Sequence, residues 1–308
     1  MAKFRARRLK RRGREAARGE GGVPQRGSRV GGPVEAPQAE RPERGGGPPR
    51  LREEGWKGWD EYAAFYDWEN AQTLDRRDVR FWQSMARRAK GPVLELGCGT
   101  GRIAIPVART GVHVVGVDRS EEMLGRARRR SKRTRLSGRI SWVRADIRSL
   151  PFQEPAPFDL VMAPYGILQS LVRESDLKAA LGSVARVLAP GGVFGLDLVP
   201  DLPVWKEYRN HVRFRGSRRG GKSRVTLVES VRQDRARRLT IFDQEYIETR
   251  GRARRTSTFS LVFRTLSVPQ MQSRLERAGF AVRAVLGDYG GKPWDPRADV
   301  WLILAEKC

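Results

Sequence analysis

Residues that build disulfide scaffolds or metal centres are scarce in this sequence. Its 308 residues include two cysteines, Cys98 and Cys308, and two histidines, His113 and His211. Neither cysteine has the spacing of a metal-ligand motif or of a disulfide framework. We therefore expect neither a disulfide scaffold nor a metal site.

Long apolar runs are also missing. No stretch approaches the roughly eighteen consecutive apolar residues of a membrane-spanning helix, and the N-terminal region lacks the apolar centre of a secretory signal. The sequence predicts a protein without a membrane span, and the cytoplasm is its expected location.

Large apolar side chains are rare in residues 1–50, which are rich in arginine, glycine and proline. Such a segment buries too little surface to offset the entropy lost on ordering its backbone. We expect a disordered basic tail. An electrostatic tether to RNA or membrane, a transit-like segment and an over-long gene start all remain open for it.

Positive charge is in excess, because the formal net charge is +26. A basic surface attracts polyanions, so nucleic acid is a possible partner. A highly charged, solvated surface encoded by a GC-rich genome explains the same composition. The charge alone therefore assigns no partner.

A glycine-rich turn is the most informative motif. The apolar run 93–96 contains one acidic residue, Glu95, and leads into Gly97-Cys98-Gly99-Thr100-Gly101. This pattern predicts a buried strand that breaks into a tight turn, where backbone atoms can approach a ligand closely. A second predicted strand, 112–117, ends at Asp118, whose carboxylate suits the two hydroxyls of a ribose. This order of strand, glycine turn, second strand and aspartate indicates a nucleotide-type site.

Four ordered motifs resemble those of class I S-adenosylmethionine-dependent methyltransferases. They are the G-x-G-x-G turn followed by Asp118, the run Ala145-Asp146-Ile147 after a third strand, a fourth strand over 158–163, and a turn over 188–194 into a fifth strand. Dinucleotide-binding dehydrogenases carry G-x-G-x-x-G instead, so the spacing disfavours that class. The resemblance covers about residues 56–308 and implies S-adenosyl-L-methionine as cofactor.

The resemblance also implies which residues surround the cofactor. The turn would approach the donor's methionine portion, Asp118 would take the ribose hydroxyls, and Asp146 with Ile147 would border the adenine. Glu95 would orient the turn or the donor's ammonium group, although Glu95 and Asp146 could instead cap backbone N–H groups. The complete predicted cofactor set is Tyr66, Glu95, Gly97, Cys98, Gly99, Gly101, Asp118, Arg119, Met123, Asp146, Ile147 and Ala163.

The acceptor side is less defined. Ala163-Pro164-Tyr165-Gly166 stands where amino-methylating nucleic-acid enzymes carry D/N/S-P-P-Y/F/W, and the alanine counts against base N-methylation by that route. No catalytic residue is assigned, because methyl transfer from a sulfonium depends mainly on positioning and exclusion of water. The predicted substrate residues are Pro164, Tyr165, Gln169, His211, Asp288 and Tyr289.

Periodicity and the resemblance together define an α/β organisation. Strand and helix patterns alternate over 91–199, as in a doubly wound, mostly parallel, seven-stranded Rossmann-like sheet. An aromatic-rich helical cap over 51–90 precedes this core, and alternating residues within 200–266 predict an inserted antiparallel β lid. A helix capped by Ser267 and two closing strands complete the core in 267–308. Another core helix is expected to begin with a cap at Ser175.

The leading hypothesis is in-line methyl transfer to a nitrogen or oxygen atom of a small molecule. The alternative is an RNA or protein methyltransferase that uses the basic tail and the lid for phosphate contacts. A non-enzymatic nucleotide-binding module is a third hypothesis, and binding of S-adenosylmethionine rather than NAD would exclude a dehydrogenase. The oligomeric state is left open.

Deletion of residues 1–50 tests the expectation of a dispensable tail. A protein that begins at Leu51 should keep the melting temperature and the donor affinity of the full chain, because the deleted composition cannot form a core. Thermal unfolding and calorimetric titration measure the two quantities. Loss of either would show that the tail docks on the folded part.

Overall fold

The computed structural model describes residues 58–73, 77–153, 158–200, 207–217, 223–298 and 300–308. The chain divides into two compact units, 1–52 and 53–308, and every described residue belongs to the second. The predicted basic tail lies outside the described residues. In the described part of the chain, no helix has both the length and the apolar character needed to cross a bilayer.

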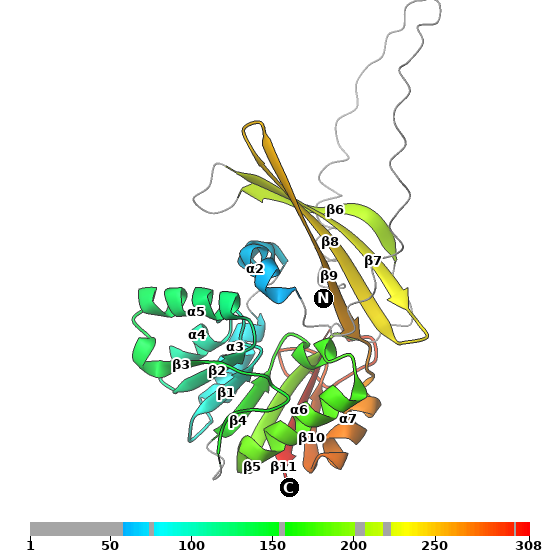
Figure 1. Ribbon diagram of the computed structural model, residues 1–308. Coiled ribbons are helices and arrows are strands. Elements are labelled where there is room, and N and C mark those ends of the chain that lie inside the picture. Colours follow the sequence, from blue (N-terminus) through cyan, green and yellow to red (C-terminus); the bar gives the residue numbers. More distant parts are fainter. Residues whose placement is uncertain (1–57, 74–76, 154–157, 201–206, 218–222, 299) are drawn as a thin grey trace, which may run out of the picture. The chain divides into compact units, whose positions relative to one another are not determined.

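A seven-stranded sheet carries the fold (Figure 1). Its strand order is β10-β11-β5-β4-β1-β2-β3, and β11 alone runs antiparallel to its two neighbours. The predicted mostly parallel seven-stranded sheet is confirmed. The strands are β1 (Val93–Leu96), β2 (Val114–Asp118), β3 (Ile140–Arg144), β4 (Phe158–Ala163), β5 (Leu188–Leu198), β10 (Phe280–Leu286) and β11 (Trp301–Lys307).

Strand β1 lies at the point where the strand order reverses. The chain runs from β1 outward through β2 and β3 on one side, and through β4 and β5 on the other. All four residues of β1 are buried, as expected for a parallel strand covered on both faces. Ligands of such sheets bind beyond the carboxyl ends of the strands at this reversal, which is where the glycine turn begins.

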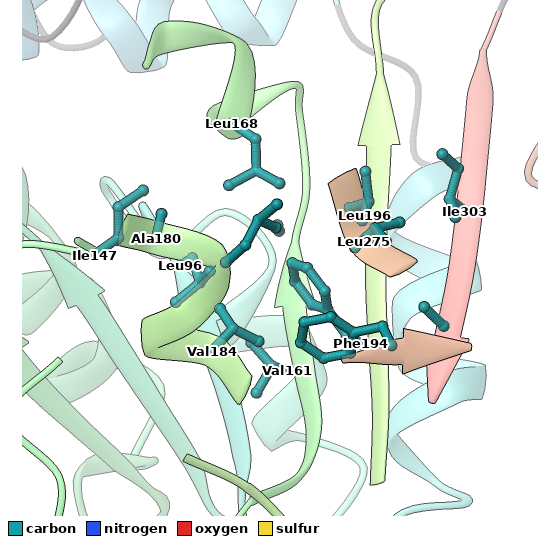
Figure 2. Close-up of a cluster of buried hydrophobic side chains, with 14 of the residues drawn as sticks. Leu96, Ile147, Val161, Leu168, Ala180, Val184, Phe194, Leu196, Leu275 and Ile303 are labelled. Atoms are coloured by element: carbon teal, nitrogen blue, oxygen red, sulfur yellow. The ribbon is translucent and has the colours of Figure 1, made fainter. Parts of the chain in front are cut away.

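Helices α6 (Glu174–Val187) and α7 (Val268–Arg277) contribute to the main apolar core. Figure 2 shows Val184 of α6 and Leu275 of α7 with Val161, Phe194 and Ile303 of the central strands. All five side chains are fully buried. Their burial fixes the helices on the sheet, because removal of apolar area from water is the main stabilising contribution to folding.

Helices α3 (Arg77–Ala86), α4 (Ala104–Ala108) and α5 (Glu121–Arg133) belong to the first half of the fold. Trp82 of α3 is completely buried. A Cβ atom at Gly195 of β5 would lie 2.9 Å from the Trp82 ring, so the glycine leaves the space that the indole fills. Helix α3, which falls within the predicted helical cap, is therefore an integral part of the core.

Two predicted helix starts have different outcomes. Ser267 caps α7 in a reciprocal capping box with Gln270, as the sequence indicates. The expected cap at Ser175 is wrong, because α6 begins at Glu174 with Arg173 in the N-cap position and no side-chain cap. The first turn of α6 carries Glu174 and Asp176, and these charges favour the positive end of the helix dipole.

A separate four-stranded antiparallel sheet is inserted between β5 and α7. Its strands are β6 (Tyr208–Ser217), β7 (Arg224–Asp234), β8 (Leu239–Arg250) and β9 (Ala253–Arg264), hydrogen-bonded in chain order. This four-stranded sheet confirms the predicted antiparallel insertion. Alternate residues of β7 are buried, which is the pattern of a strand with one covered face.

Helix α2 (Trp59–Thr73) packs against the four-stranded sheet. The rings of Phe65 and Tyr246 stack with centroids 4.3 Å apart, and Phe259 of β9 packs against both. Aromatic pairs with this spacing contribute beyond their buried area. The predicted aromatic-rich segment thus forms a helix whose rings join it to the insertion.

Candidate active site

The glycine turn after β1 has a backbone conformation that residues with a side chain rarely adopt. Gly97, Gly99 and Gly101 have φ angles of 60°, 53° and 75°, in the left-handed region that favours glycine. A Cβ atom at Gly97 would lie 2.5 Å from Ile167, and one at Gly101 would lie 2.7 Å from Trp142. The turn therefore favours glycine at all three positions for its conformation, and at Gly97 and Gly101 also for space.

Asp118 at the end of β2 is hydrogen-bonded to this turn. Its Oδ2 atom accepts from the backbone N–H of Gly99 at 2.8 Å, and its Oδ1 atom accepts from the backbone N–H of Ser120 at 2.9 Å. Burial raises the pKa of Asp118, and the backbone N–H groups partly oppose that shift. A carboxylate offers about four acceptor positions, so Asp118 can also accept hydroxyl groups of a ligand.

Glu95 of β1 is a buried carboxyl with capacity for a ligand. Its side chain is 2% exposed, and its Oε2 atom has no hydrogen-bond partner among the described residues. Burial raises the pKa of Glu95 to about 8, although the positive charge of Arg102 lowers it. A buried polar atom without a partner is rare in folded proteins, so this oxygen suits a cationic or N–H group of a bound molecule.

Helix α2 packs against the glycine turn through Tyr66 and Asp67. The Tyr66 ring and hydroxyl are 3.8–3.9 Å from the Cβ position of Gly99. Thr100 Oγ1 donates to Asp67 Oδ1 at 2.7 Å, and Arg130 donates to the Thr100 carbonyl oxygen at 3.0 Å. Burial raises the pKa of Tyr66 to about 12, so its hydroxyl stays protonated near neutral pH and can donate.

The segment after β4 contains a strained residue. Tyr165 has a φ angle of 65°, which is costly for a residue with a side chain and is common at functional sites. Its hydroxyl donates to Asn70 Oδ1 at 3.2 Å, and the Arg102 guanidinium lies 5.2 Å from its ring centroid. Arg102 is held in turn by Asp78 at 2.6 Å. These contacts fix the ring near the turn.

Asp197 of β5 accepts hydrogen bonds from the same segment and from Tyr289. Its Oδ1 atom accepts from the Gly166 N–H at 2.7 Å, and its Oδ2 atom accepts from the Tyr289 hydroxyl at 2.8 Å. Burial raises the pKa of Asp197, while the N–H and hydroxyl donors lower it. The predicted substrate residues Pro164, Tyr165 and Tyr289 thus belong to one connected region.

The remaining predicted cofactor residues lie in the glycine turn, in the first turn of α5, after β2 and β3, and at the end of β4. Arg119 pairs with Asp146 at 3.0 Å, and Asp146 also pairs with Arg148 at 2.7 Å. Burial raises the pKa of Asp146, but hydrogen bonds from Arg148 lower it to a net decrease. Buried side chains complete the set, namely Cys98, Met123, Ile147 and Ala163.

Two predicted substrate residues, Gln169 and Asp288, are hydrogen-bonded to the backbone, and a third, His211, is exposed. Gln169 is buried, and its amide bonds the backbone of Val199 and Arg264. His211 is an exposed residue of β6 rather than of a preceding loop. Asp288 accepts from the backbone N–H groups of Gly290 and Lys292. Their roles toward a substrate stay predictions.

Several residues of this region were not predicted from the sequence. Asn70 lies four residues after Tyr66, so the two share a helix face, and its Nδ2 atom is buried without a partner in the described ranges. Arg102 directly follows the turn, which is the local signal that could have identified it. Asp78 and Asp197 carry no such signal. Among the described residues, no cluster of three or more His, Cys, Asp or Glu could hold a metal ion.

This chain resembles known methyltransferases in sequence and in fold. Residues 93–192 match the family model described as "Methyltransferase domain". The chain is 30% identical over 144 residues to the sterol 24-C-methyltransferase ERG6B of Gibberella zeae, covering 45% of this chain and 37% of that relative. The chain thus spans well under half the length of that relative.

Two further matches cover more of the chain. The cypemycin N-terminal methyltransferase of a Streptomyces species is 28% identical over 227 residues, which cover 73% of this chain and 87% of that protein. The solved structure of the CcbJ methyltransferase from Streptomyces caelestis is similar with a TM-score of 0.67 and 20% identity, covering 81% of this chain and 97% of that one. The second match extends the likeness of fold beyond the central domain.

Proposed function

We propose that the chain is an S-adenosylmethionine-dependent enzyme that transfers a methyl group to a nitrogen or oxygen atom of a small molecule, in keeping with the match of residues 93–192 to a methyltransferase domain. The observation that carries the proposal is that the glycine turn, Asp118 and Glu95 lie together at the point where the strand order reverses. In addition, helix α2 with Tyr66 lies against this group. Such an arrangement suits a ligand with a ribose and an ammonium group.

The residues present fit S-adenosylmethionine. Asp118 would accept the ribose hydroxyls, and the partnerless Oε2 atom of Glu95 would accept from the ammonium group. Ile147 and Asp146 would border the adenine, as their place after β3 suggests. Tyr66, which lies close to Gly99, would cover the donor from the side of α2.

The cofactor supplies an electrophilic methyl group on a sulfonium. The chain positions the reacting groups and excludes water. Methyl transfer needs the acceptor atom in line with the bond that breaks, so fixed placement contributes much of the rate. Tyr165 is held by Asn70 and Arg102 and would border the acceptor. The four-stranded sheet would exclude water, which is how lids act in many enzymes.

A small acceptor is favoured over a nucleic-acid base. The position before Pro164 is Ala163, which has no polar group to hold a base amine. The names of the relatives reported above refer to a sterol and to cypemycin, and neither refers to nucleic acid. The RNA alternative therefore gains no support.

Transfer from radiolabelled S-adenosylmethionine tests the proposed function. The protein is offered a panel of small amines and alcohols, with total yeast RNA and histone protein as competing classes. Label in a small acceptor, lost in the Tyr66→Ala variant, is the expected result. Label only in RNA or protein would contradict the small-molecule assignment, and donor binding without any turnover would favour a binding module.

The affinity for S-adenosylhomocysteine should rise with pH between about 6 and 7.5. Glu95 has a pKa near 8 in the free protein, so most copies must lose a proton before the carboxylate can bind an ammonium group. Affinity then rises by at most about tenfold per pH unit below that pKa and levels off above it. Calorimetry in buffers of different ionisation enthalpy measures both the affinity and the released proton.

Glu95→Gln is the matched control for this pH dependence. Glutamine has nearly the same shape but does not titrate, so its affinity should be lower and flat over the same range. A wild-type affinity that does not change with pH would remove Glu95 from the ammonium site. The same conclusion would follow if the slope persisted in Glu95→Gln.

A further inference from the structure

Helix α2 contacts the donor turn and the four-stranded sheet within a single helical turn. On the donor side, Tyr66 lies beside Gly99, and Asp67 accepts a hydrogen bond from Thr100 at 2.7 Å. On the other side, Glu69 accepts a hydrogen bond from Tyr246 of β8. Residues 66–69 therefore connect two parts of the chain that are far apart in sequence.

Glu69 is unusually well placed for this connection. Its side chain is 1% exposed, and its Oε2 atom accepts from the hydroxyls of both Tyr62 and Tyr246, the latter at 2.6 Å. One acceptor therefore joins a tyrosine of the helix to a tyrosine of the sheet. The stacked rings of Phe65 and Tyr246 add an apolar contact beside it.

The polar contacts continue into the four-stranded sheet. Tyr246 is 3.4 Å from Gln244 Oε1, and Gln244 Nε2 donates to Glu229 Oε2 at 2.9 Å. Glu229 is fully buried and lies 3.2 Å from Arg213 of β6. A chain of polar contacts thus reaches from α2 to β8, β7 and β6.

We propose that Glu69 is a positioning residue that couples donor binding to docking of the four-stranded sheet. A helical turn moves as a rigid unit, so a donor that orders Tyr66 and Asp67 also orders Glu69 and strengthens its contact with Tyr246. By thermodynamic reciprocity, the docked sheet strengthens donor binding by the same factor. Donor binding then raises the fraction of molecules in which the sheet is docked and the acceptor site is complete.

This inference rests on the proposed function in one respect only, which is that the docked sheet covers the acceptor. The coupling itself is measured with S-adenosylhomocysteine alone. Coupling without turnover of any acceptor would remove the sheet's role as a lid and leave the coupling intact. A wild-type protein that does not bind S-adenosylhomocysteine would overturn both.

The first test compares the wild-type chain with Tyr246→Phe. This variant keeps the ring that stacks on Phe65 and loses only the hydroxyl. Its affinity for S-adenosylhomocysteine should fall by about fivefold or more, the lower end of typical coupling factors, although Tyr246 does not belong to the predicted donor set. Hydrogen exchange of the peptide 239–250 should slow when the wild type binds S-adenosylhomocysteine, and this slowing should be lost in the variant.

Ser260→Ala is the matched control. It removes one hydroxyl-to-carboxylate hydrogen bond, from Ser260 to Asp243, within the same sheet. Asp243 is on the opposite face from Gln244 and Tyr246, because neighbouring residues of a strand point to opposite faces. This variant should keep both the affinity and the ligand-dependent slowing of exchange.

Variants of Glu69 separate coupling from stability. Glu69→Gln keeps an oxygen that can accept one tyrosine hydroxyl and should retain part of the coupling, whereas Glu69→Ala should retain none. The melting temperature of each variant is measured in parallel. Exchange in 239–250 that does not respond to ligand in the wild type would overturn the proposal, as would a Tyr246→Phe variant that matches the wild type in affinity and in ligand response.

Discussion

Excision of the four-stranded sheet should abolish methyl transfer while the protein still binds S-adenosylhomocysteine. The proposed donor residues Glu95 and Asp118 lie outside the insertion, whereas the proposed cover of the acceptor site is removed. Loss of water exclusion and of acceptor positioning should lower the transfer rate by at least about a hundredfold. The rate is measured with the acceptor identified by the radiolabel panel.

The structure suggests how to make this excision cleanly. Gln169 Nε2 donates to the carbonyl oxygens of both Val199 and Arg264, at 3.1 and 3.2 Å. The two ends of the insertion therefore lie side by side, so a short Gly-Ser linker can join them without moving β5 or α7. Replacing Phe65 by a polar residue in the same variant would limit aggregation through the uncovered face of α2.

Two measurements decide the outcome of the excision. Donor affinity is expected to fall only by the coupling factor assigned to Glu69 and Tyr246, which shows that the core is folded. A truncated, folded protein that methylates its acceptor at the full rate would show that the sheet is a binding or oligomerisation appendage. A protein that loses the donor altogether would place the insertion in the donor site.

Asp118→Ala should weaken the binding of S-adenosylhomocysteine by about 1–3 kcal/mol, the usual cost of leaving buried polar groups without partners. The substitution removes the acceptor of the Gly99 and Ser120 N–H groups together with the proposed acceptor of the ribose hydroxyls. Isothermal titration calorimetry measures the change, and circular dichroism checks the fold.

Asp159→Ala provides the control for Asp118→Ala. Asp159 is also a strand carboxylate, but it stands near the start of β4, at the amino end of the sheet and away from the glycine turn. Its removal should leave the donor affinity unchanged. An unchanged affinity for S-adenosylhomocysteine in a folded Asp118→Ala protein would contradict the assignment of Asp118 to the ribose site.

The central fold could be predicted because its signals are local. A buried strand, three alternate glycines and a terminal aspartate stand within a few residues of each other, and each has a direct physical reason. The sequence predicts the fourth strand over 158–163, and β4 has those bounds. Alternation within the insertion predicted an antiparallel sheet for the same reason, because the period of two is visible in the sequence itself.

The long-range contacts around Tyr165 and Glu69 could not be predicted in this way. Tyr165 meets Asn70 across 95 residues, and Tyr246 meets Glu69 across 177. No local period relates such partners, and one sequence contains no record of their pairing. The left-handed backbone of Tyr165 also has no local signal, since glycine and asparagine are the residues that usually mark it.

The separation of Glu69 from Tyr246 has a consequence for synthesis of the protein. Helix α2 is translated 177 residues before the tyrosine that completes its surroundings, so its aromatic side chains leave the ribosome long before β8 and β9 exist. At about 5–20 residues per second, that interval lasts on the order of ten seconds or more. During this time the aromatic side chains of α2 lack the partners that β8 and β9 supply, so α2 completes its native packing only after β9 has been synthesised.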